Sequence, residues 1–221
     1  MLAALTGCGS SSSGNGVASK SPAGIVAAAK AAADGASSVH VTGSTVTAGA
    51  PITLDLHLVA GQGGSGQLTE NGLSFELIEL DGTVYIKGSP AFYSHFAGSS
   101  AAQLLQGKWL KAPVSNASFA GLSSLTGLRG LLDSVLSSAL ARPQTLVKTG
   151  TTTVAGQAAV GVRDTSQSGT LYVATTGPAY PIQIAKHGTG GGAITFSEWG
   201  RPVTLTAPAN AVGIEQLEKG Q

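Results

Sequence analysis

An α+β fold is predicted for this chain: a single curved antiparallel sheet whose concave face is covered by helices. Two stretches, 39–87 and 146–198, each contain several short segments with strand-like patterns. Helical patterns lie before the first stretch and between the two. Connections within each stretch are short, which favours antiparallel neighbours because parallel strands need a long crossover. Helices placed between the two halves of a curved sheet then pack on its concave face.

The first eight residues predict the compartment. Met1 to Cys8 resembles the end of an apolar signal peptide, and Leu5-Thr-Gly-Cys8 resembles the bacterial lipobox, whose cysteine sulfur receives a diacylglycerol. A secretory signal has a basic segment and about 7–15 apolar residues, whereas only six residues separate Met1 from Cys8 and none is basic. Either translation starts upstream, or Met1 lies inside the signal. The alternative is a free cysteine in an irregular N-terminus.

Composition along the chain indicates an anchor followed by one domain. We assign residues 1–8 to a residual signal peptide and lipobox, 9–20 to a tether, 21–213 to the folded domain and 214–221 to a C-terminal tail. The tether is rich in serine and glycine, which give flexible linkers. This organisation predicts an extracytoplasmic protein anchored to the cell membrane through a lipid on Cys8.

Charge and cysteine content exclude several classes of partner and site. The chain has 12 Lys and Arg against 11 Asp and Glu, for a formal net charge of +1. Nucleic-acid binders need clustered basic side chains that displace counterions, so no nucleic-acid partner is predicted. A single cysteine in 221 residues excludes an intrachain disulfide and a multi-cysteine metal site. No run of 18 apolar residues occurs, so no transmembrane helix is predicted.

The predicted domain begins with a helix and continues as a meander of about five strands. Ser21 suits the N-cap, Pro22 suits the first helical turn, and Gly35 ends the alanine-rich helix. Apolar and polar residues alternate strictly in Ile52–Leu58, which predicts a strand with one buried face. The other predicted segments are the strands Val39–Thr47, Gln67–Glu70, Leu73–Leu77 with a bulge at Ile78–Leu80, and Thr83–Lys87, and the turns Gly61–Gly66, Asn71-Gly72 and Asp81-Gly82.

Helical segments follow the meander, and strands then resume. Residues 90–106 show helical spacing in short pieces, and 107–111 is a brief extended segment with Trp109 as an anchor. Residues 127–141 form the strongest amphipathic helix, which Pro143 ends. The later predicted segments are the strands Leu146–Val154, Ala158–Arg163, Gly169–Ala174, Pro181–Lys186 and Ala193–Glu198, with Val203–Thr206 as a candidate last strand and Ile214–Leu217 as a helical turn.

No catalytic residue, metal site or cofactor is predicted, and the protein is not expected to be an enzyme. The four histidines show no metal-binding spacing in the sequence, and we interpret each as a polar surface residue. They are His40, His57, His95 and His187. The chain has neither the G-x-S-x-G motif nor the S-x-x-K motif of serine enzymes. Glu76 and Glu79, three residues apart on a strand, point to opposite faces unless a bulge intervenes.

Short motifs spread over the chain add a family resemblance. They are Gly169-Thr-Leu-Tyr-Val-Ala174, Gly177-Pro178, Tyr180-Pro-Ile-Gln-Ile184, Ile194-Thr-Phe-Ser-Glu-Trp-Gly200, the segment 203–208, Asp81-Gly-Thr-Val-Tyr-Ile86 and Gly107-Lys-Trp109. Together with the lipobox, they resemble the LppX/LprG-type lipoproteins of actinobacteria over nearly all of residues 8–213. The resemblance implies a half-barrel sheet wrapped around helices, related to LolA-like lipoprotein carriers. It also implies a hydrophobic cavity that holds an acylated lipid, but no fixed set of cavity residues.

We therefore predict an envelope lipoprotein that binds an acylated lipid or glycolipid and carries or presents it. Its other expected partner is the membrane that holds its anchor, and any envelope transport partner is unknown. The helical pieces of 90–106 are the expected lid. The residues expected to line the cavity are Leu54, Leu56, Leu58, Phe75, Leu77, Val84, Ile86, Phe92, Phe96, Leu104, Leu105, Leu128, Leu131, Leu132, Val135, Leu136, Ile182, Ile184, Ile194 and Phe196.

Two other interpretations fit the same sequence. The apolar stripes are equally those of an ordinary protein core. The chain is then a structural or interaction lipoprotein of the same fold, with a collapsed cavity and no ligand. A hydrolase with an unrecognised site is the third interpretation.

Overall fold

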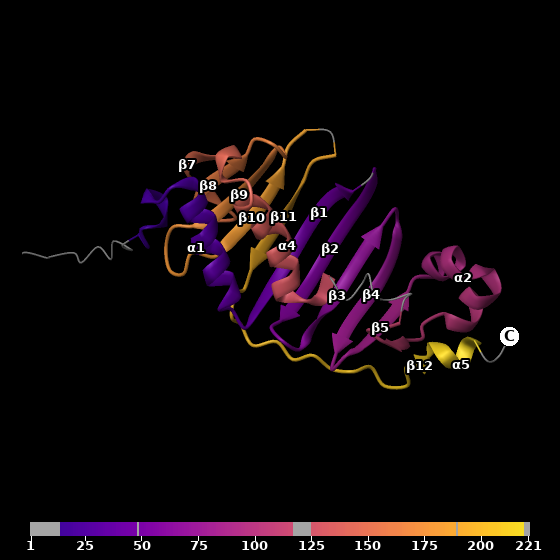
Figure 1. Cartoon of the computed structure of the whole chain (residues 1–221). Coiled ribbons are helices and arrows are strands. Elements are labelled where there is room, and N and C mark those ends of the chain that lie inside the picture. The colour runs from indigo at the N-terminus through magenta and orange to yellow at the C-terminus, as the bar shows by residue number, and fades with distance from the viewer. Residues whose placement is uncertain (1–13, 48, 117–124, 189, 219–221) are drawn as a thin grey trace, which may run out of the picture.

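The computed structural model describes residues 14–47, 49–116, 125–188 and 190–218, which Figure 1 shows as ribbons. Cys8 and the predicted signal segment lie outside these described residues. Twelve strands form one open sheet, and a few helices accompany it. The predicted α+β fold, with a single curved and mainly antiparallel sheet, is confirmed.

Ten of the twelve described strands fall into the two predicted runs, and β6 and β12 lie outside them. In chain order they are β1 (Ser38–Thr47), β2 (Ala50–Val59), β3 (Gly63–Glu70), β4 (Leu73–Leu80), β5 (Thr83–Gly88), β6 (Leu110–Pro113), β7 (Leu146–Val154), β8 (Gln157–Asp164), β9 (Gly169–Ala174), β10 (Pro181–Lys186), β11 (Gly192–Ser197) and β12 (Val212–Gly213). Across the sheet the order is β12-β6-β5-β4-β3-β2-β1-β11-β10-β9-β8-β7, so the two runs meet where β1 pairs with β11. Only β12, beside β6, is parallel to its neighbour among the described strands.

The helices begin and end where the sequence favours it. They are α1 (Pro22–Asp34), α2 (Pro90–Leu105), α4 (Leu128–Leu140) and α5 (Ile214–Glu218), with short 3-10 turns η1 (Val17–Ser19) and η2 (Pro143–Thr145). Ser21 caps α1, because its Oγ accepts a hydrogen bond of 3.2 Å from the backbone N–H of Gly24. Gly35 follows the last residue of α1 as predicted. The predicted helical pieces of 90–106 correspond to α2, which is interrupted at Gly98 (φ 82°).

Two tight turns in the first run are as predicted. Asn71 and Gly72 have φ angles of 50° and 78°, and Asp81 and Gly82 have 51° and 72°. Positive φ at both central residues is the requirement of the type I′ turn, which matches the twist of the flanking strands. These turns fix the register of β3, β4 and β5.

Three predictions about strands are wrong. Strand β4 pairs with β3 and β5 without any register shift, so the expected bulge at Ile78–Leu80 is absent, and Glu76 and Glu79 lie on opposite faces. The segment predicted as the turn Gly61–Gly66 enters β3 at Gly63. Glycine suits this part of β3 because a Cβ on Gly66 would overlap the carbonyl oxygen of Asp55 in β2.

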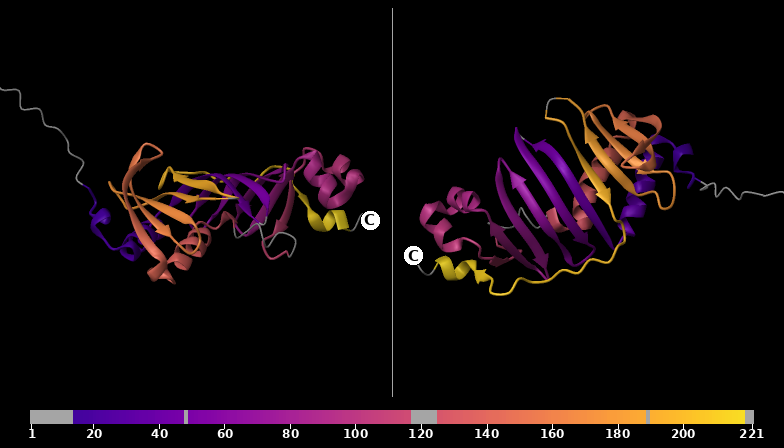
Figure 2. Two further views of the ribbon diagram at one scale, coloured as in Figure 1. Left: turned by 90° about the horizontal axis from the view of Figure 1, so that it is seen from above. Right: turned by 180° about the vertical axis from the view of Figure 1, so that it is seen from behind.

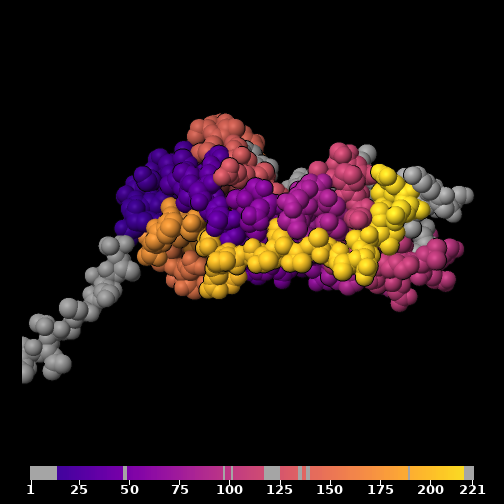
Figure 3. Space-filling view, turned by 90° about the horizontal axis from the view of Figure 1, so that it is seen from below, coloured from indigo at the N-terminus to yellow at the C-terminus, as the bar shows by residue number. Residues whose placement is uncertain are grey.

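The third wrong prediction concerns Val203–Thr206, which forms no strand. The segment from Trp199 to Ala211 instead runs along the ends of the strands to the far edge of the sheet, and we call it the strap (Figure 3). Trp199 fixes its beginning by stacking on Tyr180, with ring centroids 4.6 Å apart. At its far end the N–H of Val212 donates to the carbonyl of Trp109, which brings β12 beside β6.

Part of the predicted tether belongs to the folded body. Val17 is buried in the hydrophobic core, although it lies within the segment 9–20. The Nδ2 of Asn15 donates to the carbonyls of Ala174 and Gly177, at 3.0 and 2.9 Å. Sequence composition missed this packing because a lone valine in a serine- and glycine-rich segment carries no periodic signal. The described residues before α1 therefore pack against the second run of strands.

The two faces of the sheet differ sharply in polarity. We call the face that bears Leu56, Leu77 and Ile86 the inner face, and the face that bears Asp55 and Glu76 the outer face. Both α1 and α4 lie on the inner side (Figure 2), and their apolar residues share one buried cluster with the inner residues of the strands. The main core of the molecule thus lies between these two helices and the sheet.

Candidate functional site

Most residues predicted to line a cavity lie together on the inner side of the sheet. Ten are buried in the main cluster: Leu56, Leu58, Phe75, Leu77, Val84, Ile86, Leu128, Leu132, Leu136 and Phe196. Five more are half-buried and pack against it: Leu54, Phe92, Leu131, Ile184 and Ile194. The side chain of Val135 lies outside what the structure describes. The strictly alternating strand and the amphipathic helix together supply seven of these fifteen residues, and the other strands and α2 supply the remaining eight.

Strand register explains why these residues meet. At one level of the sheet, each inner residue pairs with the next inner residue on the neighbouring strand. The row runs across six strands, as Phe196, Val41, Leu56, Gly66, Leu77 and Ile86. Five of these six residues are apolar and buried. The inner face therefore offers a continuous apolar strip that crosses the seam between β1 and β11.

The predicted interior is nearly full. The apolar space found between the helices and the sheet has a volume of about 100 Å³. Its apolar lining is Val26, Leu136, Leu146, Val162, Leu171 and Ile184. Cavities of about 150 Å³ take up benzene, and pockets for drug-sized ligands hold about 300–1,000 Å³. Within the described residues, this space has no room for an acyl tail in the present conformation.

One side of this space is polar. Asp164, Gln167 and Thr170 line it beside the apolar residues. The N–H and Oγ of Ser166 both donate to the carboxylate of Asp164, at 2.8 and 2.6 Å. These hydrogen bonds, the side-chain one first, hold the pKa of Asp164 below its ordinary value. A charged carboxylate, that of Asp164 at the turn of the β8–β9 hairpin, therefore borders the apolar space.

The lid residues divide into two groups. Phe92 tilts against Phe75 with ring centroids 5.0 Å apart, and Leu105 is buried in a small separate cluster with Tyr93. In contrast, the predicted lining residues Phe96 and Leu104 are 67% and 66% exposed. Their prediction as interior residues is wrong in this conformation, because α2 lies at the β5 end of the sheet, away from α4 (Figure 1).

Ile182 is also misplaced by the prediction. Simple alternation puts Ile182 and Ile184 on one face, but the pairing of β10 with β9 shifts between Pro181 and Gln183. Ile182 consequently packs with Ala159 and Ala174. These two alanines pair with each other and lie on the outer side, because the next residues on their strands, Val160 and Val173, face inward. A β-bulge re-aims side chains in this way.

Polar contacts hold α4 in place. Lys30 on α1 forms ion pairs with Asp133 on α4 and with Asp34, the latter at 2.9 Å. The hydrogen bond to Asp133, and then that to Asp34, raises the pKa of Lys30 above its ordinary value. Just before α4, the hydroxyl of the buried Thr126 donates to the carboxylate of Glu79 on β4. Two charged side chains thus tie the segment containing α4 to α1 and to the sheet.

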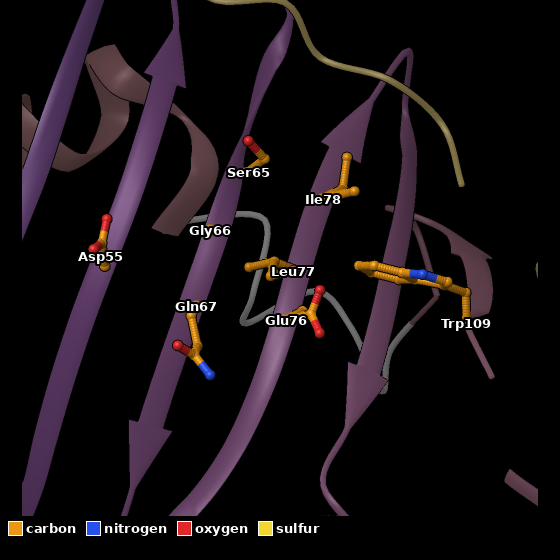
Figure 4. Close-up of a pocket in the computed structure, with 8 residues that line it drawn as sticks. All are labelled: Asp55, Ser65, Gly66, Gln67, Glu76, Leu77, Ile78 and Trp109. Atoms are coloured by element: carbon orange, nitrogen blue, oxygen red, sulfur yellow. The ribbon is translucent and has the colours of Figure 1, made fainter. Parts of the chain in front are cut away.

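A larger depression lies on the opposite side of the sheet. This outer groove has a volume of about 440 Å³, and Figure 4 shows its residues. They are Asp55, Ser65, Gly66, Gln67, Glu76, Leu77, Ile78 and Trp109. Trp109 is half-buried, and the Nζ of Lys87 lies 5.8 Å from its ring centroid. The predicted anchor residue Trp109 therefore lies at a polar surface and outside the main core.

The outer groove is chemically unlike the interior. Its carboxylates, amide and hydroxyl suit a polar ligand, and an acyl chain would leave them without water. Asp55 is one of the polar residues that alternate with apolar ones in Ile52–Leu58, so the same pattern that predicted the inner face also predicted that Asp55 lies on the outer face. Nothing in the sequence indicated that Trp109 would join residues of β2, β3 and β4.

Among the described helices, none is long and apolar enough to cross a membrane.

Comparison with known proteins gives a fold match and no sequence match. No family model and no curated protein matches the chain. The structure is similar to that of LprF from Mycobacterium bovis, with a TM-score of 0.58 and 17% identity over 86% of this chain and 97% of that one. It is also similar to the Mycobacterium tuberculosis lipoprotein LppX, with a TM-score of 0.52 and 17% identity over 84% and 98% of the two chains. The chain therefore has the fold of LprF and LppX, as the motifs in its sequence had indicated.

Proposed function

We propose that this protein is an envelope lipoprotein, tethered outside the cell membrane through Cys8, that binds an acyl chain of a lipid between the inner face and α4. The observation that supports this proposal best is the apolar strip of the inner face, which shares one buried cluster with residues of α1 and α4. The shared fold with the lipoprotein LppX agrees with the proposed anchor. On this proposal the protein carries or presents its lipid, and catalysis is not required.

Binding on this proposal requires α4 to move, because the existing space of about 100 Å³ is too small. Leu128, Leu132 and Leu136 cover the sheet in the closed state. An entering acyl chain would take over their contacts, so the strip would stay covered throughout. Each buried methylene contributes about 0.8 kcal/mol, which favours entry of a long chain. The cost is the displacement of α4 and its ion pair with Lys30.

The polar side of the interior space provides for the rest of the lipid. A headgroup must stay in water while its tail is buried, since a buried polar group without partners is unfavourable. Asp164 and Gln167 line the apolar space and are themselves partly or largely exposed to solvent, whereas the third polar lining residue, Thr170, is buried. We therefore place the headgroup at the β8–β9 hairpin and the tail beneath α4.

A second candidate function has its own support. The filled interior suits an interaction lipoprotein of the same fold that binds no lipid. On that alternative, the inner residues serve only as the core, and ligands bind elsewhere on the surface. The two candidates predict different contents for the purified protein.

Native mass spectrometry of the lipoprotein, extracted from membranes in mild detergent, distinguishes the two candidates. Binding predicts a non-covalent acyl-lipid adduct that disappears on denaturation, in addition to the covalent anchor. Substituting Leu132→Trp should remove the adduct, because the indole occupies the space beneath α4, and overpacking should lower stability by about 1–3 kcal/mol. Arg129→Trp, on the exposed side of the same helix, is the matched control and should keep the adduct. Lipid-free wild-type protein would support the interaction alternative.

The anchor is tested separately. Cells that express the protein from a start codon placed upstream are fed a clickable fatty acid. The wild-type chain should become labelled and Cys8→Ala should not. An unlabelled wild-type chain would remove the anchor from the proposal and leave the lipid-binding part to the mass-spectrometric test.

A further inference from the structure

Three side chains that can bind a metal ion meet on the outer face. His40 lies on β1, His57 on β2, and Glu198 directly follows β11. One ligand atom of each lies within 4.8 Å of the ligand atoms of the other two. The two histidines are half-buried and the glutamate is exposed. Because β2, β1 and β11 are adjacent in the sheet, this cluster sits across the seam between the two runs of strands.

Strand pairing fixes the two histidines. His40 and His57 are directly opposite each other in the β1–β2 register. Their rings are stacked, with centroids 4.1 Å apart and planes inclined by 7°. Directly opposed residues in an antiparallel pair have their Cβ atoms only about 4.5–5.5 Å apart. The fold therefore brings two imidazoles together although the histidines are separated by a turn and most of two strands.

The backbone turns at Glu198. This residue has a φ of 52°, in the left-handed region that residues other than glycine seldom adopt. It follows Ser197, which pairs with His40. The Nη1 of Arg201 contacts Oε1 of Glu198 at 3.2 Å, which leaves the second carboxylate oxygen for another ligand. Arg201 is itself held because its carbonyl accepts a hydrogen bond from the Oγ of Ser38.

A fourth residue orients the cluster. The Oδ1 of Asp55 lies 2.7 Å from Nε2 of His40. Metal-bound histidines commonly donate their second ring N–H to a carboxylate, which fixes the ring and increases the basicity of the coordinating nitrogen. Asp55 has this relation to His40. The arrangement thus contains two imidazoles and one carboxylate as ligands, with an outer carboxylate behind one imidazole.

We propose that His40, His57 and Glu198 bind a zinc ion on the outer face, with Asp55 as the outer-shell partner of His40. Two histidines and one glutamate, with a fourth position left for water, are an established ligand set for Zn²⁺. Bond lengths of about 2.0–2.2 Å require ligand atoms roughly 3.3–3.5 Å apart. Zinc binding therefore requires the two stacked rings to tilt so that a nitrogen of each points at the ion. The exposed Glu198 side chain must also rotate toward them.

The position of the ion indicates its effect. It would connect β2 and β1 to the residue at which the strap leaves β11. Asp55 also lines the outer groove, so the ion would lie beside that groove. Binding to the folded state alone raises stability in proportion to the logarithm of the ligand concentration above Kd. Zinc should therefore raise the melting temperature of the protein.

The test uses the full chain without an affinity tag, with Cys8→Ala as the common background so that the thiol cannot bind metal. After treatment with a chelator, titration calorimetry with zinc chloride should give one ion per chain. Cobalt(II) should give the intense visible bands of a four-coordinate site. His57→Gln and Glu198→Gln should each weaken zinc binding at least tenfold and remove the zinc-dependent rise in melting temperature. Asp55→Asn should weaken it about 10–100-fold.

Two histidines elsewhere provide matched controls. His95→Gln and His187→Gln remove exposed histidines outside the cluster and should leave zinc affinity unchanged. Circular dichroism of each metal-free variant checks that the sheet is intact. Absence of binding in the wild type, or equal binding in Glu198→Gln and the wild type, would overturn the proposal. The result is independent of lipid binding, because the cluster lies on the opposite face from the inner strip.

Discussion

The inner and outer faces of the sheet are built from alternate residues of the same strands, yet the two faces differ in how far they tolerate substitution without loss of stability. Inner residues such as Leu77 are fully buried in the main cluster, to which residues of α1 and α4 also belong. Their outer neighbours, such as Glu76 and Ile78, are half-exposed and line a groove. A change of one position along a strand therefore separates residues that hold the fold from residues that are free to bind. A lipid site on the inner face would have to use the side chains that also stabilise the protein.

The largest predicted effect compares two neighbours on β4. Leu77→Ala should lower the free energy of unfolding by about 2–5 kcal/mol, because it removes a fully buried side chain and leaves a cavity. Ile78→Ala, one residue further on and only partly buried, should lower it by less, about 1–2 kcal/mol, because part of its side chain already contacts solvent and truncation leaves no enclosed cavity. Urea unfolding followed by circular dichroism measures both changes. Similar losses in the two variants would mean that the outer groove is covered in solution.

The second prediction compares two valines that both face inward. Val173 on β9 is fully buried in the main cluster, and Val173→Leu should lower stability by about 1–3 kcal/mol through overpacking. Val162 on β8 lines the space of about 100 Å³, so Val162→Leu has room for its extra methylene. It should leave stability unchanged or raise it by up to about 2 kcal/mol.

Thermal and urea unfolding of both valine variants measure this difference. A loss in Val162→Leu equal to that in Val173→Leu would show that the interior is uniformly filled in solution. That outcome would also count against lipid binding, since no starting space would remain beneath α4.

Local sequence rules predicted the inner face because each rule depends on near neighbours alone. Alternation in Ile52–Leu58 gave the buried side of β2, and helical spacing gave the buried side of α4. Asn71-Gly72 gave a two-residue turn, which in turn set the register of β3 and β4. With the register set, the strip across the sheet follows without further information.

The features that the sequence did not predict depend on contacts between segments that are distant along the chain. The bulge that moves Ile182 to the outer side arises in the pairing of β10 with β9. The exposure of Phe96 follows from where α2 lies relative to α4, which helical spacing does not determine. His40 and Glu198 are 158 positions apart, and only the pairing of β1 with β11 brings them together. Sequence spacing along one strand therefore gave no reason to expect a metal-binding cluster.

The smallest predicted effect concerns the charged contact above the inner face. Lys30 has a raised pKa because of its hydrogen bonds to Asp133 and Asp34, so folding favours the protonated amine. Its contribution is complete below the unfolded-state lysine pKa of about 10.4 and is lost as the pH rises through the higher folded-state pKa. Exposed ion pairs contribute little, so the effect should be smaller than either comparison above.

Urea midpoints near neutral pH and above about pH 11 test this directly, with Lys30→Met compared with the exposed Lys186→Met. Lys30→Met should lower the midpoint slightly at neutral pH, and its difference from the wild type should shrink at the alkaline pH. Lys186→Met should show no such convergence. If Lys30→Met also strengthens the acyl-lipid adduct in native mass spectra, the contact between α1 and α4 opposes lipid entry. An unchanged adduct would instead mean that apolar packing between α4 and the inner face, and not the ion pair of Lys30, opposes lipid entry.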